Sequence, residues 1–140
     1  MIRKLFSHTA MITACLLPLS ALADVVVIVN PSVSVTATQA EAGDFFLGKS
    51  PTIGGVALKA VDQESGSASR DTFYEKAAGK NASQLNAHWS RIVFTGKGQP
   101  PKAVGDDSQV KEAVAKDKTL IGYIDSSALD SSVKKVVAVK

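Results

Sequence analysis

The stretch from Val61 to Arg70 constrains the fold most, because it joins two kinds of secondary structure through a short turn. The apolar run 56–61 that leads into it is typical of a strand, and a helical pattern begins at Arg70. The Ser/Gly-rich turn leaves backbone N–H groups unpaired at the helix start, where the positive end of the helix dipole lies. Such a turn either binds an anion such as phosphate, sulfate or a carboxylate, or is closed by a capping hydroxyl of Ser65 or Ser67. The residues of the turn leave both interpretations open.

Four apolar runs predict strands, and helical patterns separate most of them. The runs cover residues 24–29, 56–62, 120–124 and 133–139. The first run has no polar alternation, so we expect it to be buried on both faces. The lysines of the last run indicate an edge strand. Strands that alternate with helices predict an α/β fold, a three-layer αβα domain with a mainly parallel sheet.

Ligands of such sheets bind at the carboxyl ends of the strands. Three strand ends in this sequence carry polar residues: the turn 62–70, the exit Asn30-Pro31-Ser32 and the exit Asp125-Ser126-Ser127. We therefore predict that Asn30 and Ser32 belong to the same ligand site as the turn. The exit after the third predicted strand should face the same rim.

Capping residues mark the predicted helices. Thr38 and Glu41 form a capping box, and the short helix that follows should close at Gly48. The helix that begins after the Ser/Gly turn should stop at Gly79.

A third predicted helix carries Leu85, Trp89 and Ile92 on one face, and either Asn81 or Ser83 caps it. We interpret the single tryptophan as a core anchor packed under the sheet rather than as a platform for ligand stacking.

Residues 1–23 have the composition of a secretory signal peptide. A basic start at Arg3 and Lys4 precedes an apolar run and a small-x-small site at Ala21 to Ala23, so we expect cleavage after Ala23 and a periplasmic location. A lipoprotein cleavage box that ends at Cys15 is the alternative. We expect no membrane-spanning helix, because the apolar run is short and no second one follows it.

The predicted mature chain, residues 24–140, is long enough for one domain with one core. The whole sequence has 16 basic and 13 acidic residues, and the leader holds two of the basic ones. Net charge therefore gives no case for binding nucleic acid or an anionic membrane. The only cysteine lies in the leader, so the domain has no disulfide and no cysteine-based metal site.

The sequence has no motif that carries catalysis, so we predict a protein that is not an enzyme and holds no cofactor or metal. His88 is the only histidine after the leader, and no nucleophile motif flanks it. Gly96-Lys97-Gly98 is too short to indicate a phosphate-binding loop. The adjacent carboxylates of Asp106 and Asp107 are interpreted as caps of the next helix rather than as a metal pair.

Segments along the chain resemble the periplasmic phosphate-binding proteins of ABC transporters, and more closely the short, single-lobe sequences of this kind. They span nearly all of the mature chain in the family's order. The segments are Val25–Pro31, Phe46–Lys49, Ser65–Ser67 with Phe73, Trp89 with Phe94–Gly98, and Ile121–Ile124. The resemblance implies a single lobe of a type II periplasmic binding protein-like fold, because the chain is too short to hold both lobes.

The resemblance also implies a ligand site. Ser65, Gly66 and Ser67 match the family's Ser-Gly-Thr, whose hydroxyls and N–H groups hold phosphate at a helix start. The family's arginine and aspartate ahead of that motif are replaced here by Val61 and Gln63. The charged clamp and the proton-accepting carboxylate are therefore missing.

Two other charged residues adjoin the turn. Glu64 would repel a phosphate, and Arg70 either compensates or forms a surface salt bridge with neighbours on its helix. A single lobe also leaves the anion exposed to water. We therefore expect weak binding unless a homodimer or a partner of the cell envelope covers the open side of the site. The alternative is a non-transport interaction or sensory domain of the envelope that has lost its ligand.

Overall fold

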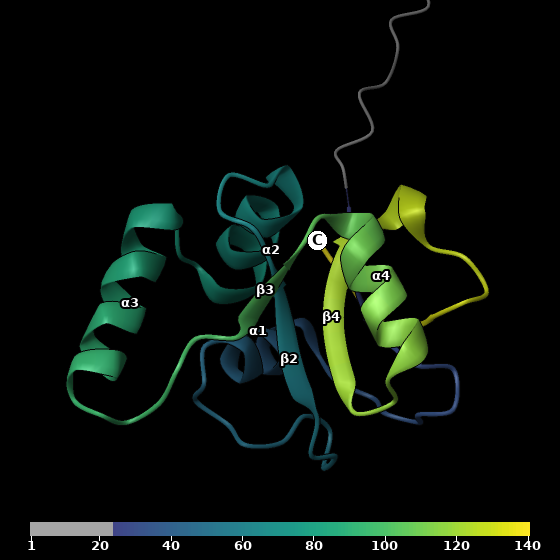
Figure 1. Ribbon diagram of the computed structural model, residues 1–140, viewed down its shortest axis with the longest axis horizontal. Helices are drawn as coiled ribbons and strands as arrows, with labels where there is room; N and C mark the ends of the chain where they lie inside the picture. The colour runs from purple at the N-terminus through teal and green to yellow at the C-terminus, as the bar shows by residue number, and fades with distance from the viewer. Residues whose placement is uncertain (1–23) are drawn as a thin grey trace, which may run out of the picture.

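The computed structural model describes residues 24–140, which form a sheet and its covering helices (Figure 1). The strands are β1 (Val25–Val29), β2 (Lys59–Gln63), β3 (Lys102–Gly105), β4 (Leu120–Asp125) and β5 (Lys134–Val139). The helices are α1 (Gln39–Phe46), α2 (Ala68–Ala78), α3 (Ala82–Phe94), α4 (Asp107–Lys116) and the short 3₁₀ helix η1 (Ser126–Ala128).

The predicted cleavage after Ala23 and the alternative at Cys15 both fall on residues 1–23, which lie outside the described residues. Within residues 24–140, none of the helices has both the length and the apolarity that a membrane crossing needs.

The five strands form one sheet in the order β3-β2-β4-β1-β5. β2 runs parallel to β3 and β4, whereas β1 runs antiparallel to β4 and to β5. Four strands thus share one direction, and β1 alone is reversed. The prediction of a mainly parallel sheet is therefore corrected to a mixed sheet with two parallel and two antiparallel pairings, because β1 lies reversed between β4 and β5. β5 lies at an edge of the sheet, as its lysines indicated.

The reversal of β1 corrects the predicted composition of the ligand site. Val25 pairs with Asp125 and Val29 pairs with Ile121, so the carboxyl end of β1 lies beside the amino end of β4. The carboxyl ends of β2 and β4 lie at one end of the sheet, and Asn30 and Ser32 therefore lie at the other end, away from the Ser65–Ser67 turn. The prediction that they share a rim with this turn is wrong, because the carboxyl end of an antiparallel strand lies beside the amino end of its neighbour.

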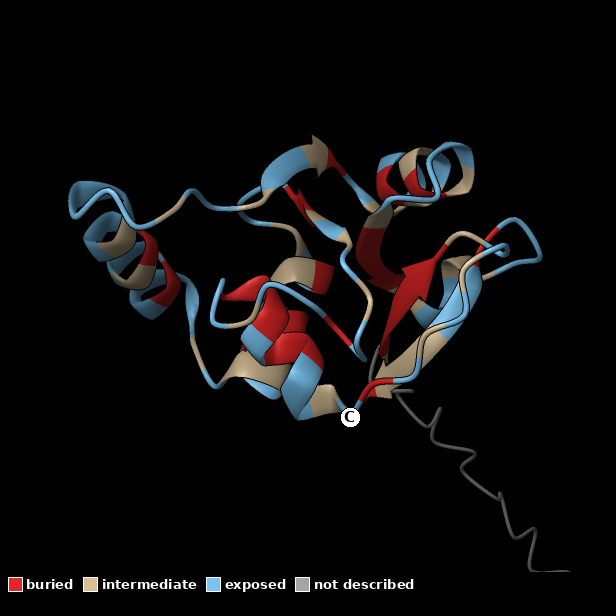
Figure 2. Cartoon of the chain, turned by 90° about the horizontal axis from the view of Figure 1, so that it is seen from below, coloured by how far each residue is buried: buried red, intermediate tan, exposed pale blue. Residues whose placement is uncertain are grey.

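Helices cover both faces of the sheet, with α4 on one face and α1 and α2 on the other (Figures 1 and 2). The β1 strand serves both cores. Its odd-numbered valines pack with α1 and α2, while Val26 and Ile28 pack with α4. All five residues of β1 are buried. The structure thereby confirms the α/β, three-layer αβα fold.

The α1 helix begins with the predicted capping box of Thr38 and Glu41 and is followed by Gly48, which has a φ of 76°. It lies close against α2: a Cβ atom at Gly43 would be 2.0 Å from the carbonyl oxygen of Ala77. Only a glycine allows the two helix backbones to approach this closely. The rings of Phe73 and Tyr123 then stack at 4.2 Å between α2 and the sheet.

Two strands differ from the sequence prediction. β2 begins at Lys59, because Val56 instead forms an isolated bridge with Ile53. The sequence pattern does not predict β3 at all. This strand is short, follows two prolines, and leaves Lys102 and Ala103 exposed, so it shows neither a hydrophobic run nor a full alternation.

The α3 helix lies at one end of the molecule, to the left in Figure 1. Asn81 caps it, and its buried side chains are Leu85 and Trp89. The indole of Trp89 lies beside Gly48, because a Cβ atom there would be 3.1 Å from the ring. Trp89 is a core anchor as predicted, but it packs on the end of α1 rather than under the sheet.

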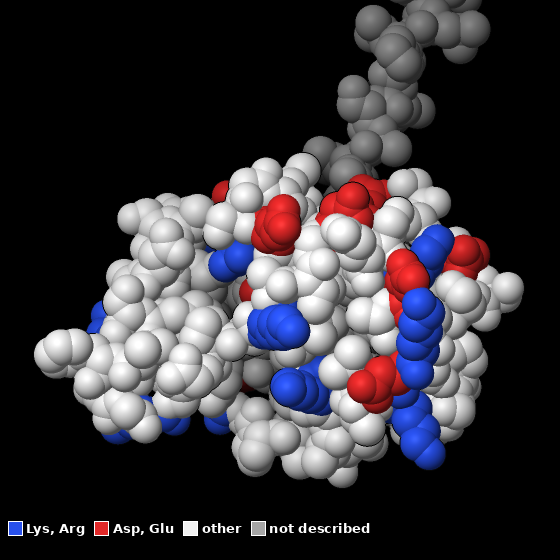
Figure 3. Space-filling model, in the orientation of Figure 1, with Lys and Arg blue, Asp and Glu red and all other residues white. Residues whose placement is uncertain are grey.

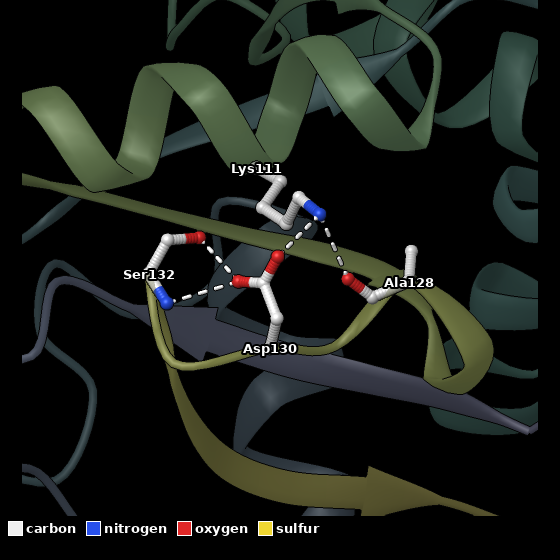
Figure 4. A network of polar contacts seen from close by, with 4 residues as sticks. All are labelled: Lys111, Ala128, Asp130 and Ser132. Atoms are coloured by element: carbon white, nitrogen blue, oxygen red, sulfur yellow. Dashed lines mark hydrogen bonds and ion pairs between the residues drawn. The ribbon is translucent and has the colours of Figure 1, made fainter.

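The segment between β4 and β5 is fastened to α4 by a small polar network (Figure 4). Lys111 Nζ donates to Asp130 Oδ2 at 2.9 Å and to the carbonyl oxygen of Ala128 at 3.1 Å. The other oxygen of Asp130 accepts from the backbone N–H and the hydroxyl of Ser132. Hydrogen bonds from Ser132 and Lys111 lower the pKa of Asp130 below its usual value.

Candidate functional site

The turn between β2 and α2 is built from Glu64 to Ser67. Its first N–H, from Glu64, donates to the carbonyl oxygen of Gly105 at 3.0 Å, which ties the turn to the end of β3. The N–H of Ser67 donates back to the carbonyl oxygen of Glu64, and Gly66 has a φ of 89° that a side chain would strain. The turn therefore has a defined shape at the carboxyl end of β2.

Ser67 is the residue that caps α2. Its Oγ accepts a hydrogen bond from the N–H of Arg70 at 3.2 Å, which decides between the two serines that the sequence offered as caps. The same hydroxyl donates to Oε1 of Gln63 at 2.5 Å. Because a hydroxyl has a single hydrogen, that hydrogen points into the protein rather than toward an anion outside the turn.

Gln63 holds the turn in place from the interior of the protein. It is buried, and its amide nitrogen donates to Asp107 Oδ1 at 2.7 Å and to the carbonyl oxygen of Tyr123 at 3.0 Å. Both ends of this side chain are thus satisfied by the protein. Gln63 holds Ser67 in place, and it offers no acceptor to a ligand.

Asp107 connects further elements at this rim, besides its contact with Gln63 of β2. Its Oδ1 also accepts from the backbone N–H of Asp125 at 2.9 Å, and its Oδ2 accepts from Ser69 Oγ at 3.2 Å. The carboxylate therefore connects the start of α4, the end of β4 and the start of α2. The predicted proximity of the Asp125-Ser126-Ser127 exit to the turn is confirmed.

The neighbouring carboxylate has a different role, because Asp106 caps α4 with the help of Gln109. Within residues 24–140, no group of three or more histidine, aspartate or glutamate side chains is arranged to hold a metal ion.

A second carboxylate, that of Asp62, is buried and lies one residue before Gln63. It accepts hydrogen bonds from the hydroxyl of Tyr74 at 2.7 Å, from the hydroxyl of Tyr123, and from the backbone N–H of Gln63 at 2.8 Å. Burial, and then the charge of Asp62, raise the pKa of both tyrosines above the usual 10.0. Both phenols therefore stay protonated and remain donors.

Arg70 lies beside the turn. Its Nη1 donates to the carbonyl oxygen of Gln63 at 2.9 Å, and its guanidinium carbon is 5.8 Å from the centre of the Tyr74 ring. The structure shows no ion pair between Arg70 and another described residue. Its positive charge therefore stays at this rim, next to the start of α2.

The outer side of the turn is open. Ser65 and Gly66 are exposed, and a Cβ atom at Gly66 would meet no other atom within 4 Å. The cap leaves the first N–H groups of α2 without helical partners. Glu64 is also exposed here, and Asp71 adds a second negative charge in the first turn of α2. The turn offers backbone donors and one hydroxyl, but a mixed electrostatic environment.

Several grooves of the described residues lie away from the turn. Four of them have volumes between about 320 and 670 Å³, and none of these four is lined by Ser65, Gly66 or Ser67. An anion at the turn would therefore be bound on an open surface.

At the opposite edge of the sheet, Asn30 closes the end of α4. Its Nδ2 donates to the carbonyl oxygens of Val114 at 3.2 Å and Ala115 at 2.9 Å. Its Oδ1 accepts from the N–H and the hydroxyl of Ser32. Both polar ends of Asn30 are thus used within the fold. Its amide nitrogen satisfies carbonyls that the helix end leaves free, and its oxygen binds Ser32.

Sequence reasoning missed the importance of Asp62, Tyr74 and Tyr123. The three side chains are far apart in the chain, and no short motif links them. The only available signal was a charged residue at the end of an apolar strand, since a buried carboxylate needs hydrogen-bond donors nearby.

Comparison with known proteins gives a likeness of fold. No protein-family model and no curated protein sequence matches the chain. An ABC-type phosphate transport receptor from Vibrio cholerae superposes with a TM-score of 0.61 at 17% identity, over 81% of this chain and 45% of the receptor. A phosphate ABC transporter substrate-binding protein from Clostridium perfringens, solved with bound phosphate, gives 0.59 at 24% identity, over 81% and 44%.

The five-stranded α/β domain thus has the fold of these substrate-binding proteins, and the chain spans less than half the length of either one.

Proposed function

We propose that this chain is a periplasmic solute-binding protein of the phosphate type, which binds an oxyanion weakly at the amino end of α2. One observation carries the proposal: α2 begins at an open turn at the carboxyl end of β2, in a fold shared with a protein solved with bound phosphate. The donors are the backbone N–H groups at Gly66 and Ala68, the hydroxyl of Ser65 and the charge of Arg70. Ser67 contributes its place in the turn rather than its hydroxyl.

Three features make the binding weak. The hydroxyl hydrogen of Ser67 is taken by Gln63, Glu64 repels an anion, and the turn is open to water. Charge-assisted hydrogen bonds are strongest where water is excluded. A homodimer or an envelope partner that covers the turn would therefore strengthen the binding.

Binding rather than catalysis is supported by the side chains around the turn. The one histidine of the described chain is elsewhere, with Nε2 of His88 2.8 Å from the carbonyl oxygen of Leu47. The carboxylates of Asp62 and Asp107 are each occupied by donors of the protein. We propose that neither a cofactor nor a metal takes part.

Isothermal titration of residues 24–140 with phosphate and with sulfate tests the proposal. We expect a dissociation constant on the order of millimolar, which corresponds to a binding free energy of about −4 kcal/mol. Ser65→Ala and Arg70→Gln should weaken it several-fold, and Glu64→Gln should strengthen it. Ser83→Ala, an exposed serine on α3, is the matched control. No heat with either anion at high millimolar concentration would reject the proposal.

A second candidate is an interaction or sensory domain of the envelope that has kept the lobe and lost the ligand. The inward hydrogen bond of Ser67 favours it, because the hydroxyl that the resemblance assigns to phosphate is engaged. A specific envelope partner whose binding is unaffected by Ser65→Ala and Ser67→Ala would support this candidate. Recovery of no partner, together with measurable anion binding, would exclude it.

A further inference from the structure

The near-neutral charge of the chain conceals a strongly positive region. Residues 76–105 contain five basic residues and no acidic residue, so all 13 acidic residues of the chain lie outside this region. Among the described residues, none of the five forms an ion pair. The surface over α3 accordingly shows blue groups and no red ones (Figure 3). The five residues are Lys76, Lys80, Arg91, Lys97 and Lys102.

An apolar tip ends α3 within this region. Phe94 is 93% exposed and Val93 is 42% exposed, and among the described residues no other large hydrophobic side chain is exposed to this degree. Leaving a whole phenylalanine ring in water forgoes the stabilisation that burial would give. The exposed ring is therefore free to contact an apolar surface outside the described residues.

Cations flank the tip on both sides. Arg91 lies three residues before Phe94 and therefore on the neighbouring side of the helix. After Phe94 the chain turns at once: the N–H of Gly96 donates to the carbonyl oxygen of Val93, and that of Lys97 donates to the carbonyl oxygen of Ile92. Lys97 is thus held beside the end of the helix. The tip combines two apolar side chains with two exposed positive charges.

The tip lies away from the candidate anion turn. The chain leaves α3 through Pro100 and Pro101 and enters β3 at its amino end, and β3 is parallel to β2. The tip is therefore near the amino ends of these strands, whereas the turn 64–67 is at the carboxyl end of β2. A surface that covers the tip leaves the turn free.

We propose that the tip of α3, residues 91–97, docks on an anionic phospholipid bilayer. Phe94 and Val93 enter the boundary between headgroups and acyl chains, and Arg91 and Lys97 pair with lipid phosphates. Charge complementarity selects this occupant, because the region has no acidic residue to repel such a membrane. A second copy of the chain would bring a region of the same positive charge against it. Two apolar side chains are also far fewer than a stable protein interface uses.

Co-sedimentation of residues 24–140, which contain every described helix and strand, tests this inference. The probes are vesicles of equal parts phosphatidylglycerol and phosphatidylcholine, and vesicles of phosphatidylcholine alone. We expect binding to the anionic vesicles at low salt, and at least a five-fold loss on neutral vesicles or in about 0.5 M salt, where the Debye length falls to a few ångströms. Binding that is equal on both kinds of vesicle, or absent from the anionic ones at low salt, overturns the proposal.

Variants separate the tip from general charge effects. Phe94→Ser and Lys97→Glu should each lower the bound fraction several-fold, Phe94→Trp should retain it, and Lys118→Glu, an exposed residue beyond α4, should lower it least. Ser65→Ala and added inorganic phosphate, matched for ionic strength, should leave it unchanged, so failure of the anion site does not affect this test. An equal loss with Lys118→Glu, or a dimer that forms without lipid and depends on Phe94, overturns the proposal.

Discussion

The hydroxyl of Ser67 donates to the side-chain oxygen of Gln63 at 2.5 Å, so the residue that caps α2 is bonded to the last residue of β2 across the turn. Gln63 is in turn held by Asp107, at the start of α4. The shape of the candidate site is therefore fixed by partly buried hydrogen bonds that join the residues of three elements, and not by a ligand.

Gln63→Glu tests this arrangement. The substitution replaces an amide N–H donor by a carboxylate oxygen next to Asp107 and the carbonyl oxygen of Tyr123. We expect the free energy of unfolding at neutral pH to fall by about 2–4 kcal/mol. The pKa of the new carboxyl should be raised in the folded state, so the deficit shrinks below the unfolded pKa of about 4.3 and grows as pH rises through the folded value.

Urea unfolding of the Gln63→Glu variant at acid and neutral pH provides the measurement. Gln99→Glu, at an exposed position, is the matched control and should change stability little. Unchanged stability of the Gln63 variant at neutral pH would contradict the buried network.

The two tyrosines should remain protonated as long as the protein is folded. Their pKa values are raised mainly by burial, so tyrosinate absorbance should appear only as the protein unfolds in alkali. A raised folded-state pKa contributes stability that is complete below pH 10.0 and is lost as pH rises above it. A tyrosinate signal near pH 10 from folded protein would contradict this.

The stability of the protein should depend on the hydrogen bonds that both phenols donate to the buried carboxylate of Asp62. Tyr74→Phe and Tyr123→Phe each remove a donor to this buried carboxylate, and each should lower the free energy of unfolding by about 1.5–3 kcal/mol. Because the two phenols donate to the two oxygens of one carboxylate, the double variant should depart from the sum of the single ones by at least about 0.5 kcal/mol. Denaturant unfolding measures the cycle, and strict additivity would show that the two bonds are independent.

Gly43 should tolerate no side chain. A methyl group there would lie 2.0 Å from the carbonyl oxygen of Ala77, and neither backbone can move without separating α1 from α2. We expect Gly43→Ala to lower the free energy of unfolding by about 3 kcal/mol, the upper range for overpacking. Gly98→Ala is the control, since its methyl group would lie 3.4 Å from Ile92. Equal melting temperatures for the two variants would argue against close helix packing.

Trp89→Phe should be well tolerated. The indole nitrogen is buried and has no hydrogen-bond partner among the described residues, so removing its N–H relieves a desolvation cost of about 1–3 kcal/mol that offsets the lost contact area. We expect a change in unfolding free energy below about 1 kcal/mol, against a loss of about 3–5 kcal/mol for Trp89→Ala. A large loss in the phenylalanine variant would show that the N–H has a partner in solution.

Much of the fold was predictable because its signals are local. The capping residues Thr38 and Asn81 act within one helical turn, and the apolar run of β1 reports burial on both faces from its own composition. β3 was not predictable, because a four-residue edge strand with exposed side chains carries too little pattern. Its pairing comes from the free edge of β2 rather than from its own residues.

The candidate site was likewise predictable only where its signals are local. The sequence located the turn at Ser65 to Ser67, but it could not place Asn30, whose distance from the turn depends on the direction in which β1 enters the sheet. Net charge likewise concealed the cationic region around Phe94, because the 13 acidic residues that balance it lie outside residues 76–105.

By itself, then, the sequence of Val61 to Arg70 determined a strand, a turn and a helix start, because period, glycine content and capping act over a few residues. The tertiary structure alone decided that the hydroxyl of Ser67 faces Gln63, and that Asp107 and Tyr123 hold Gln63 in place. Asp107 and Tyr123 lie 44 and 60 residues from Gln63 along the chain, and hydrogen bonds over such separations form only when the sheet brings α4 and β4 beside β2.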